Sequence, residues 1–346
     1  MSVEKTIFGA LPDGREAALY TLKNAGGMTL VTTPYGCRII QLLVPDKQGS
    51  LGDVVLGHRT LEEYFGSNYQ GTFVGRYANR IGGASFELNG KTYTLAKNDG
   101  NNTLHGGPGG YHQVLWTAET QDGEEPSITF THESPDGDEG YPGNLKLKVT
   151  YTLKKDNTLA LRYDAVCDQE TPFNPTNHSF FNLSGDPQKD VLGTYLTINA
   201  KESTAVSDDL IPTGEIVSVL GGPLDFTSPK KLGDDMFADD HMLQLCGGYD
   251  HNFVLQGEGF RRIGQVAEQE SGRVMEVYTD LPGVQLYTAN KMSGKGLGGV
   301  PHGNHCAFCL ETQYFPDSPN HPEFPFHFLQ PGEDWESVTV YQFKTC

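Results

Sequence analysis

The sequence predicts an all-β protein, folded as a large antiparallel β-sandwich with a few short helices. Glycine and proline are abundant, at 42 and 20 of the 346 residues, as a chain with many turns requires. Short runs with strand-like patterns recur from end to end, and helical periodicity is nearly absent. Because no linker, internal repeat or low-complexity tract divides the chain, we expect residues 1–346 to form a single domain.

The N-terminal part of the chain contains two expected strands and one expected helix. The run Cys37–Asp46 is strongly apolar and ends in a Pro-Asp turn, so a strand is expected there. A second, shorter strand is expected at Asp53–Leu56. Thr60 and Glu63 have the spacing of a capping box, which predicts a short helix at 61–65.

Residues 71–95 contain the clearest hairpin signal. Ser85–Leu88 and Lys91–Leu95 alternate in polarity and flank an Asn-Gly dipeptide, which is the turn that favours a two-residue hairpin loop. Asn79 and Arg80 lie in the preceding loop. An amide beside a guanidinium group suits the recognition of ligand oxygens by several donors. A surface ion pair is the alternative interpretation of Arg80.

A glycine-rich loop follows at Asn98–Trp116 and contains His105. The loop matches neither G-x-G-x-x-G nor a Gly-Lys-Ser/Thr element, so a phosphate-binding role is weakly supported. Glycines on both sides of a histidine instead let the backbone come close to a small ligand.

The middle of the chain has the plainest strand pattern. Between Leu145 and Leu153, apolar residues alternate with lysines and threonines, which indicates one buried face and one solvent face. An Asp-Asn turn leads from there into a second expected strand at Thr158–Val166.

The C-terminal half is expected to contain one helix and several strands. Ser228 followed by proline resembles a helix N-cap, which predicts a short helix there. A strand is expected at Gly247–Val254, with Asp250 near its start. A Leu-Pro-Gly turn at 281–283 predicts a hairpin between 274–279 and 284–290, and its second strand carries Gln285. The last expected strand is Ser337–Phe343.

The charge balance excludes several classes of partner. Lys and Arg number 25 and Asp and Glu 44, a formal net charge of −19. A chain this acidic repels nucleic-acid phosphates and anionic membranes. No apolar run reaches the ~18 residues of a membrane helix, and the N-terminus has no basic region followed by an apolar segment.

The six scattered cysteines do not form a disulfide scaffold, and reduced thiols in a cytoplasmic protein are expected. His302, His305, Cys306 and Cys309 are the candidates for a zinc site. These residues crowd into eight consecutive positions, whereas zinc ligands usually form two pairs across a longer loop. We therefore expect no metal there.

Two residues far apart in the sequence are candidates for an acid and a base. His178 lies in PFNPTNHSFFNLSG, where Asn and Pro can fix the orientation of its ring. Glu311 is expected on a mostly apolar strand, where loss of solvation would raise its pKa and make it a better base at neutral pH. The alternatives are a core histidine with a satisfied partner and a buried glutamate paired with an arginine.

The sequence lacks the motifs of serine and cysteine hydrolases but leaves a glycosidase possible. The sequence lacks G-x-S-x-G, and no cysteine lies in a recognisable protease context. Glycoside hydrolysis needs two carboxyl groups, and Asp250 with Glu311 can supply them, so a glycosidase stays open at this point.

Several motifs resemble those of the aldose 1-epimerases, also called galactose mutarotases, over nearly the whole chain. The matching segments, in family order, are GRYANRI with Asn79 and Arg80, LHGG at Leu104–Gly107, NPTNHSFFNLSG with His178, YDHNFVL at Tyr249–Leu255, PGVQLYTAN with Gln285, and LETQYFPDSPNHPEFP with Glu311. Any one segment alone is weak evidence. Together, in this order and spacing, they form a specific signature.

The resemblance implies a fold, an activity and two roles. The fold is the galactose mutarotase-like supersandwich, with a sugar-binding cleft on one face. The activity is the interconversion of the α and β anomers of hexoses such as galactose and glucose, without metal or cofactor. Glu311 takes the position of the base on the anomeric hydroxyl, and His178 that of the acid at the ring oxygen.

The resemblance also implies a set of contacts to the sugar. The expected substrate-binding residues are Asn79, Arg80, His105, Ser179, Phe180, Asp250 and Gln285. Phe180 is a departure, because the family often has tyrosine at that position, so only an apolar or stacking contact is expected there.

A hexose-6-phosphate epimerase and a sugar-binding module without turnover are the two alternatives to an aldose 1-epimerase. An epimerase acting on hexose 6-phosphates should gather basic residues around its cleft, yet the chain is acidic and has no such cluster near its motifs. A sugar-binding module without turnover would not need both His178 and Glu311. The expected partner is a small hexose, with no nucleic acid or membrane, and the chain is expected to be a monomer or weak homodimer.

Overall fold

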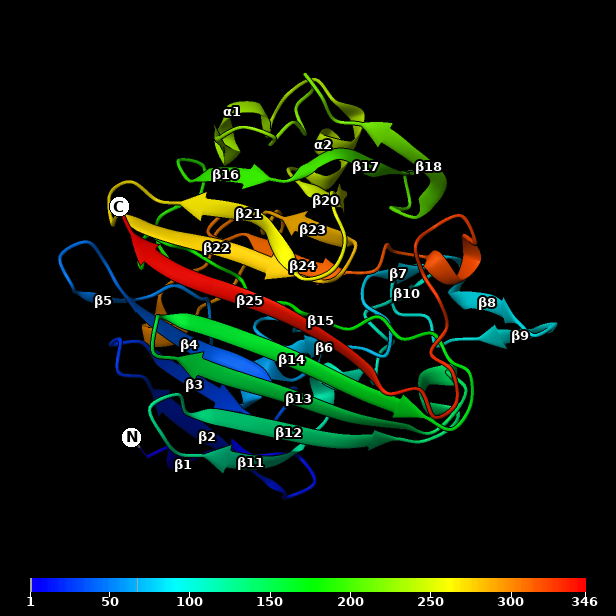
Figure 1. The fold of residues 1–346 in the computed structure, drawn as a ribbon, viewed down its shortest axis with the longest axis horizontal. Helices are drawn as coiled ribbons and strands as arrows, with labels where there is room; N and C mark the ends of the chain where they lie inside the picture. Colours follow the sequence, from blue (N-terminus) through cyan, green and yellow to red (C-terminus); the bar gives the residue numbers. More distant parts are fainter. Residues whose placement is uncertain (1, 67) are drawn as a thin grey trace.

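The computed structural model describes residues 2–66 and 68–346 and consists mainly of antiparallel strands (Figure 1). The largest sheet has nine strands. In order across the sheet they are β11 (Thr117–Gln121), β12 (Ser127–Ser134), β13 (Leu145–Lys154), β14 (Thr158–Cys167), β25 (Trp335–Thr345), β22 (Arg273–Thr279), β21 (Arg261–Ala267), β16 (Tyr195–Ile198) and β19 (Lys230–Lys231). The C-terminal strand β25 thus lies in the middle of this sheet and joins its two halves.

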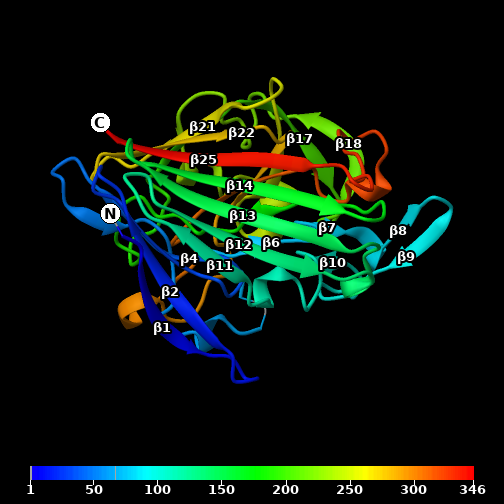
Figure 2. The same cartoon turned by 60° about the horizontal axis from the view of Figure 1, so that its bottom comes forward.

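Two five-stranded sheets accompany the large one. The first consists of β1 (Glu4–Ala10), β2 (Glu16–Lys23), β3 (Thr29–Thr33), β4 (Arg38–Pro45) and β5 (Leu51–Asp53). The second, in spatial order, consists of β18 (Pro212–Ser218), β17 (Ala200–Val206), β20 (Asp250–Leu255), β23 (Gly283–Tyr287) and β24 (Cys309–Gln313). In Figure 2, β1 and β2 lie below β12, β13 and β14.

The remaining elements are short. Three two-stranded sheets pair β7 (Arg80–Ile81) with β10 (Thr103–Leu104), β6 (Phe73–Val74) with β15 (Thr176–Asn177), and β8 (Ser85–Leu88) with β9 (Lys91–Thr94). The α-helices are α1 (Leu232–Asp235) and α2 (His241–Cys246), and the 3₁₀ turns are η1 (Glu62–Tyr64), η2 (Gly82–Ala84), η3 (Tyr111–Gln113), η4 (Asp138–Gly140), η5 (Leu297–Gly299) and η6 (Ser318–Asn320). None of the helices in the described part of the chain has the length and apolar character needed to cross a membrane.

The main core lies between the nine-stranded sheet and the two five-stranded sheets. Its buried residues include Leu42 of β4, Leu161 of β14 and Leu286 of β23, one from each sheet. Two tyrosines of the large sheet also donate hydrogen bonds across the core, from Tyr151 to the carbonyl of Cys37 and from Tyr341 to the carbonyl of Leu310. Apolar packing and buried hydroxyls therefore hold the layers together.

Most of the expected strands are confirmed. The alternation predicted from Leu145 gives β13, whose apolar side chains are buried and whose lysines point outward. The predicted strands at 37–46, 158–166 and 337–343 correspond to β4, β14 and β25, and the Asn-Gly hairpin joins β8 and β9. The capping-box helix is a single 3₁₀ turn, η1, and the amides of Arg59 and Thr60 donate to Glu63 there.

The prediction of a hairpin around Leu281 is wrong. β22 pairs with β21 and β25 in the large sheet, whereas β23 pairs with β20 and β24 in the second five-stranded sheet. Leu281 is buried in the core, so residues 280–282 carry the chain from one layer to the other instead of forming an exposed turn. The side chain of Asp280 fixes this crossing by accepting hydrogen bonds from Ser337 and from the amide of Val338.

Two other predicted boundaries are also wrong. The helix expected from Ser228 begins later, at Leu232, because Lys230 and Lys231 pair with β16 as β19. The strand expected at 53–56 is displaced toward the N-terminus, as β5 (Leu51–Asp53).

Candidate active site

A cleft of about 580 Å³ opens beside the second five-stranded sheet. Strands β20, β23 and β24 form one wall, and the loops around residues 68–70, 79–80, 105 and 178–180 form much of the rest. The expected site residues that line it are Asn79, Arg80, His105, His178, Phe180, Asp250, Gln285 and Glu311. The structure therefore brings together residues that lie more than 200 positions apart in the sequence.

Glu311 projects into the cleft from the middle of β24 and is only 2% exposed. The strand register places it opposite Gln285 of β23, which is in turn opposite Asn252 of β20. Its Oε1 atom lies 3.6 Å from Nε2 of His178, and its Oε2 atom accepts no hydrogen bond from the described residues. A buried carboxylate oxygen without a donor is costly, which is typical of an atom reserved for a ligand.

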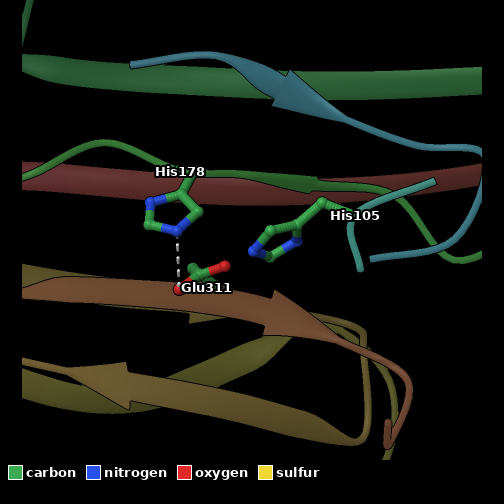
Figure 3. A group of neighbouring side chains, drawn as sticks. All are labelled: His105, His178 and Glu311. Atoms are coloured by element: carbon green, nitrogen blue, oxygen red, sulfur yellow. Dashed lines mark ion pairs between the residues drawn. The ribbon is translucent and has the colours of Figure 1, made fainter. Parts of the chain in front are cut away.

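His178 enters the cleft from the opposite side, directly after β15 (Figure 3). Its amide donates to the carbonyl of Thr72, and its carbonyl accepts from the amide of Gly71, so its backbone is held on both sides. The ring of Phe180 stacks on the imidazole, with centroids 4.9 Å apart and planes 16° apart. These contacts give the ring one orientation, with Nε2 toward Glu311.

His105 completes the group drawn in Figure 3. The amide of Asn79 donates to its Nδ1 atom at 3.1 Å, so the neutral ring carries its proton on Nε2. The rings of His105 and His178 meet edge to face at 5.2 Å. Each of His105, His178 and Glu311 offers one atom within 4.8 Å of the others, a spacing that suits either acid–base chemistry or a divalent metal ion.

Burial shifts the pKa values of these three groups. It raises the pKa of Glu311 well above its usual range, and the nearby Asp250 carboxylate adds to this while Arg80 opposes it. Burial lowers the pKa of His178 to about 4 and that of His105 well below its usual value. Burial therefore favours the uncharged form of each group: a neutral imidazole at His105 and at His178, and a protonated carboxyl group at Glu311.

The polar residues around this group form ordered pairs. Nε of Arg80 lies 2.7 Å from Oδ2 of Asp99, so the ion pair weighed for Arg80 is present, and Arg80 still lines the cleft. Nε2 of Gln285 donates to Oδ1 of Asp250 at 2.7 Å. These contacts hold Arg80 and Asp250 in fixed positions at the cleft wall.

Ser179 does not line the cleft, so the contact expected for it finds no support in the geometry. Its amide and its hydroxyl both donate to Oδ1 of Asn177, and the residue is 1% exposed. Strand-like alternation after His178 turns Ser179 away from the cleft while Phe180 faces it.

Sequence reasoning missed two residues that shape the cleft. The ring of Tyr69 packs against His105 at 4.7 Å and His112 at 4.6 Å. Arg38 is fully buried behind this loop, and its guanidinium group donates to the carbonyls of Asn68, Gln70 and His112. The position of Arg38 inside the apolar run Cys37–Asp46 indicated that its charge is buried and needs hydrogen-bond acceptors. The sequence around Tyr69 contained no comparable indication.

Comparisons with known proteins show the family of the chain. A model of the family described as aldose 1-epimerase matches residues 18–342. The chain is 43% identical to galactose mutarotase of Bos taurus, with both proteins covered completely, and 42% identical to that of Homo sapiens, with 100% and 99% covered. It is 38% identical to aldose 1-epimerase of Escherichia coli (strain K12), with 96% of each covered.

Solved structures show the fold. A GalM/aldose epimerase homologue from C. elegans superposes with a TM-score of 0.87 at 30% identity, covering 95% of this chain and 99% of the other. Galactose 1-epimerase from Lactobacillus acidophilus superposes with a TM-score of 0.88 at 28% identity, covering 99% of each. The fold is therefore that of the galactose mutarotase-like β-sandwich proteins. Within that class, the chain belongs to the aldose 1-epimerase family.

Proposed function

We propose that this protein is an aldose 1-epimerase that interconverts the α and β anomers of hexoses such as galactose and glucose. The observation that carries the proposal is the convergence of one buried carboxyl group and one buried imidazole, 3.6 Å apart, in a polar cleft. Family membership and full-length relatives named galactose mutarotase and aldose 1-epimerase support the same activity.

The reaction needs one base and one acid. Opening a hemiacetal ring removes a proton from the anomeric oxygen, O1, and adds a proton to the ring oxygen, O5. We assign the first transfer to the Glu311 carboxylate and the second to the His178 imidazolium. Rotation about the C1–C2 bond then exposes the other face of the aldehyde, and the two transfers run in reverse as the ring closes. Each positioned group of this kind typically contributes ~10²–10⁴-fold.

The proton count explains the opposite pKa shifts. The pair holds one proton throughout: on His178 before ring opening, and on Glu311 once O1 has lost its proton and O5 has gained one. Relative to water, a raised carboxyl pKa and a lowered imidazole pKa both favour the second state, in which the proton is on Glu311.

The other cleft residues are assigned to substrate binding. Asn79, Arg80, Asp250 and Gln285 offer donors and acceptors for sugar hydroxyls, and His105 presents its Nε2–H group near the reacting atoms. Phe180 offers an apolar contact, as expected for phenylalanine in place of tyrosine. We assign Ser179 to support of the His178 backbone, since its hydroxyl is bonded to Asn177.

We also propose that residues 1–346 form one domain, and that the protein is a cytoplasmic monomer or weak homodimer acting on a small sugar. One continuous core draws residues from Tyr20 to Phe343, which supports the single domain. All six cysteines are free and five are buried, which suits a reducing compartment. Light scattering over a range of protein concentrations would test the oligomeric state.

Polarimetry tests the proposed activity directly. The optical rotation of freshly dissolved α-D-galactose should approach equilibrium faster with the protein than without it. Glucose should be followed in parallel, because the geometry does not rank the two sugars. An unchanged rate with both sugars would reject the proposal.

A further inference from the structure

Strand β24 contacts both nitrogen atoms of the His178 imidazole. Nε2 lies 3.6 Å from Oε1 of Glu311, and Nδ1 lies 3.5 Å from Sγ of Cys309. Cys309 and Glu311 are two residues apart on this strand, so their side chains point to the same side. One strand thus supplies the proton partner of the imidazole and a second contact on the opposite edge of the ring.

We propose that Cys309 is a positioning residue, whose sulfur accepts a hydrogen bond from Nδ1 and so fixes the tautomer of His178. The neutral ring then carries its proton on Nδ1 and leaves a lone pair on Nε2, the nitrogen that faces the cleft. The catalytic meaning of this contact rests on the proposed function, because Nε2 must release a proton to the ring oxygen and take it back.

The surroundings of the thiol favour this role. Cys309 is completely buried in a small apolar cluster with Phe180, Ala289 and Cys306, which limits the positions its sulfur can take. Phe180 covers one face of the imidazole, so the ring is held by its face as well as by its edge. The ring therefore cannot turn to exchange its two nitrogens without disturbing this packing.

The chemistry of sulfur also suits a residue that must orient without trapping a proton. A thiol is a weak, uncharged acceptor, whereas a carboxylate in the same place would stabilise the imidazolium ion and hold the proton on the histidine. Which nitrogen of a neutral imidazole is protonated depends on the hydrogen bond made by the other. A weak partner at Nδ1 thus selects the tautomer while it leaves His178 a strong acid.

Nuclear magnetic resonance can test the tautomer without any measurement of activity. In protein with ¹⁵N-labelled histidine, long-range ¹H–¹⁵N spectra distinguish an Nδ1–H ring from an Nε2–H ring. The His178 signals are assigned by their loss in His178→Asn. We expect the Nδ1–H form in the wild type and in Cys309→Ser, and a mixture or the Nε2–H form in Cys309→Ala. Cys306→Ala, which removes another buried thiol of the same cluster, should leave the tautomer unchanged.

Kinetics then separate positioning from substrate binding. Cys309→Ala should lower kcat about tenfold with KM nearly unchanged, and Cys309→Ser should recover most of the rate. An Nε2–H ring in the wild type, or a wild-type tautomer in Cys309→Ala, would overturn the proposal. So would a loss of rate that is equal in the Ser and Ala variants with no change of tautomer. A wild type that has the expected tautomers but no epimerase activity would reject the proposed function and leave the positioning role supported.

Discussion

Arg38 and Glu311 are both buried beside the cleft, but their surroundings differ. The guanidinium group of Arg38 donates to three carbonyl groups and lies over the rings of Tyr35 and Tyr64, and among the described residues only its Nε atom lacks a partner. Glu311 has His178 just beyond hydrogen-bond distance and one oxygen with no donor. A buried charge whose hydrogen bonds are satisfied therefore stabilises the fold, whereas one that is unsatisfied is available for chemistry.

Replacing Glu311 should give the largest effect and separate activity from stability. Glu311→Gln keeps the shape but removes the base, so kcat should fall ~10³-fold. The variant should be at least as stable as the wild type at neutral pH, because a buried carboxyl group with an unpaired oxygen is lost. Polarimetry and thermal unfolding check the two parts.

The pH dependence of stability provides a control for this variant. The folded pKa of Glu311 is raised above its ordinary value of 4.5, so its stabilising effect is present at low pH and is lost as the pH rises toward the folded pKa. The difference in stability between Glu311→Gln and the wild type should therefore grow in this direction. Near wild-type turnover in the variant would remove Glu311 from the role of base.

Replacing Arg38 should show the opposite pattern. Arg38→Met leaves three carbonyl groups, two of them buried, without their donor, so we expect a loss of about 3 kcal/mol in the free energy of unfolding. Urea denaturation measures this loss. Arg162→Met is the matched control, because Arg162 is half exposed and pairs with Asp164 and Glu336 on the surface. The control should change stability by no more than about 0.5 kcal/mol. Equal losses in the two variants would contradict the structural role of Arg38.

The imidazole of His178 should make the free energy of unfolding depend on pH in the mildly acidic range. Its pKa is lowered by burial from 6.5 to about 4, so the unfolded chain binds a proton in this range while the folded protein does not. The wild type should therefore lose stability as the pH falls from about 6.5 toward 4. His178→Gln should lose less over the same range. Parallel stability curves for the two proteins would show that His178 does not titrate in this way.

The smallest effect is expected at Ser179. Like the guanidinium group of Arg38, its hydroxyl has a hydrogen-bond partner, because it donates to Asn177. Ser179→Ala should cost about 1 kcal/mol of stability through that lost hydrogen bond, with KM for galactose within about twofold of the wild type. A large rise in KM would restore Ser179 to the substrate contacts that its place next to His178 suggested.

Local sequence patterns predicted most of the strands correctly. They did not predict which strands pair with each other, because pairing depends on three-dimensional packing. Alternation from Leu145 to Leu153 predicted β13, because one face of an antiparallel strand is solvated. The turn at Leu281 misled, since a Pro-Gly pair does not reveal whether the strands beside it share a sheet. The pairing partners of β22 and β23 decide that question, and they lie in different sheets.

The sequence motifs predicted the residues that line the candidate site, but they did not predict the residues that hold those side chains in place. The resemblance to a family named eight residues that line the cleft, His178 and Glu311 among them. The contact of Cys309 with His178 joins residues 131 positions apart and arises from the position of β24 beside the loop after β15. No spacing in the sequence encodes such a contact, and the roles of Arg38 and Tyr69 were hidden for the same reason.

The crossing at 280–282 has a consequence for the motions of the protein. It ties β23 of the cleft wall directly to β22 of the large sheet, and Asp280 also binds β25 there. Local opening of the cleft wall would therefore pull on the middle of the molecule. Amide hydrogens of Gln285 and Leu286 should exchange with solvent only when the whole sandwich unfolds, while the amides of the exposed edge strand β18 exchange through small local fluctuations. Sugar would then enter and leave through movements of loops and side chains, with the catalytic strands rigid throughout turnover.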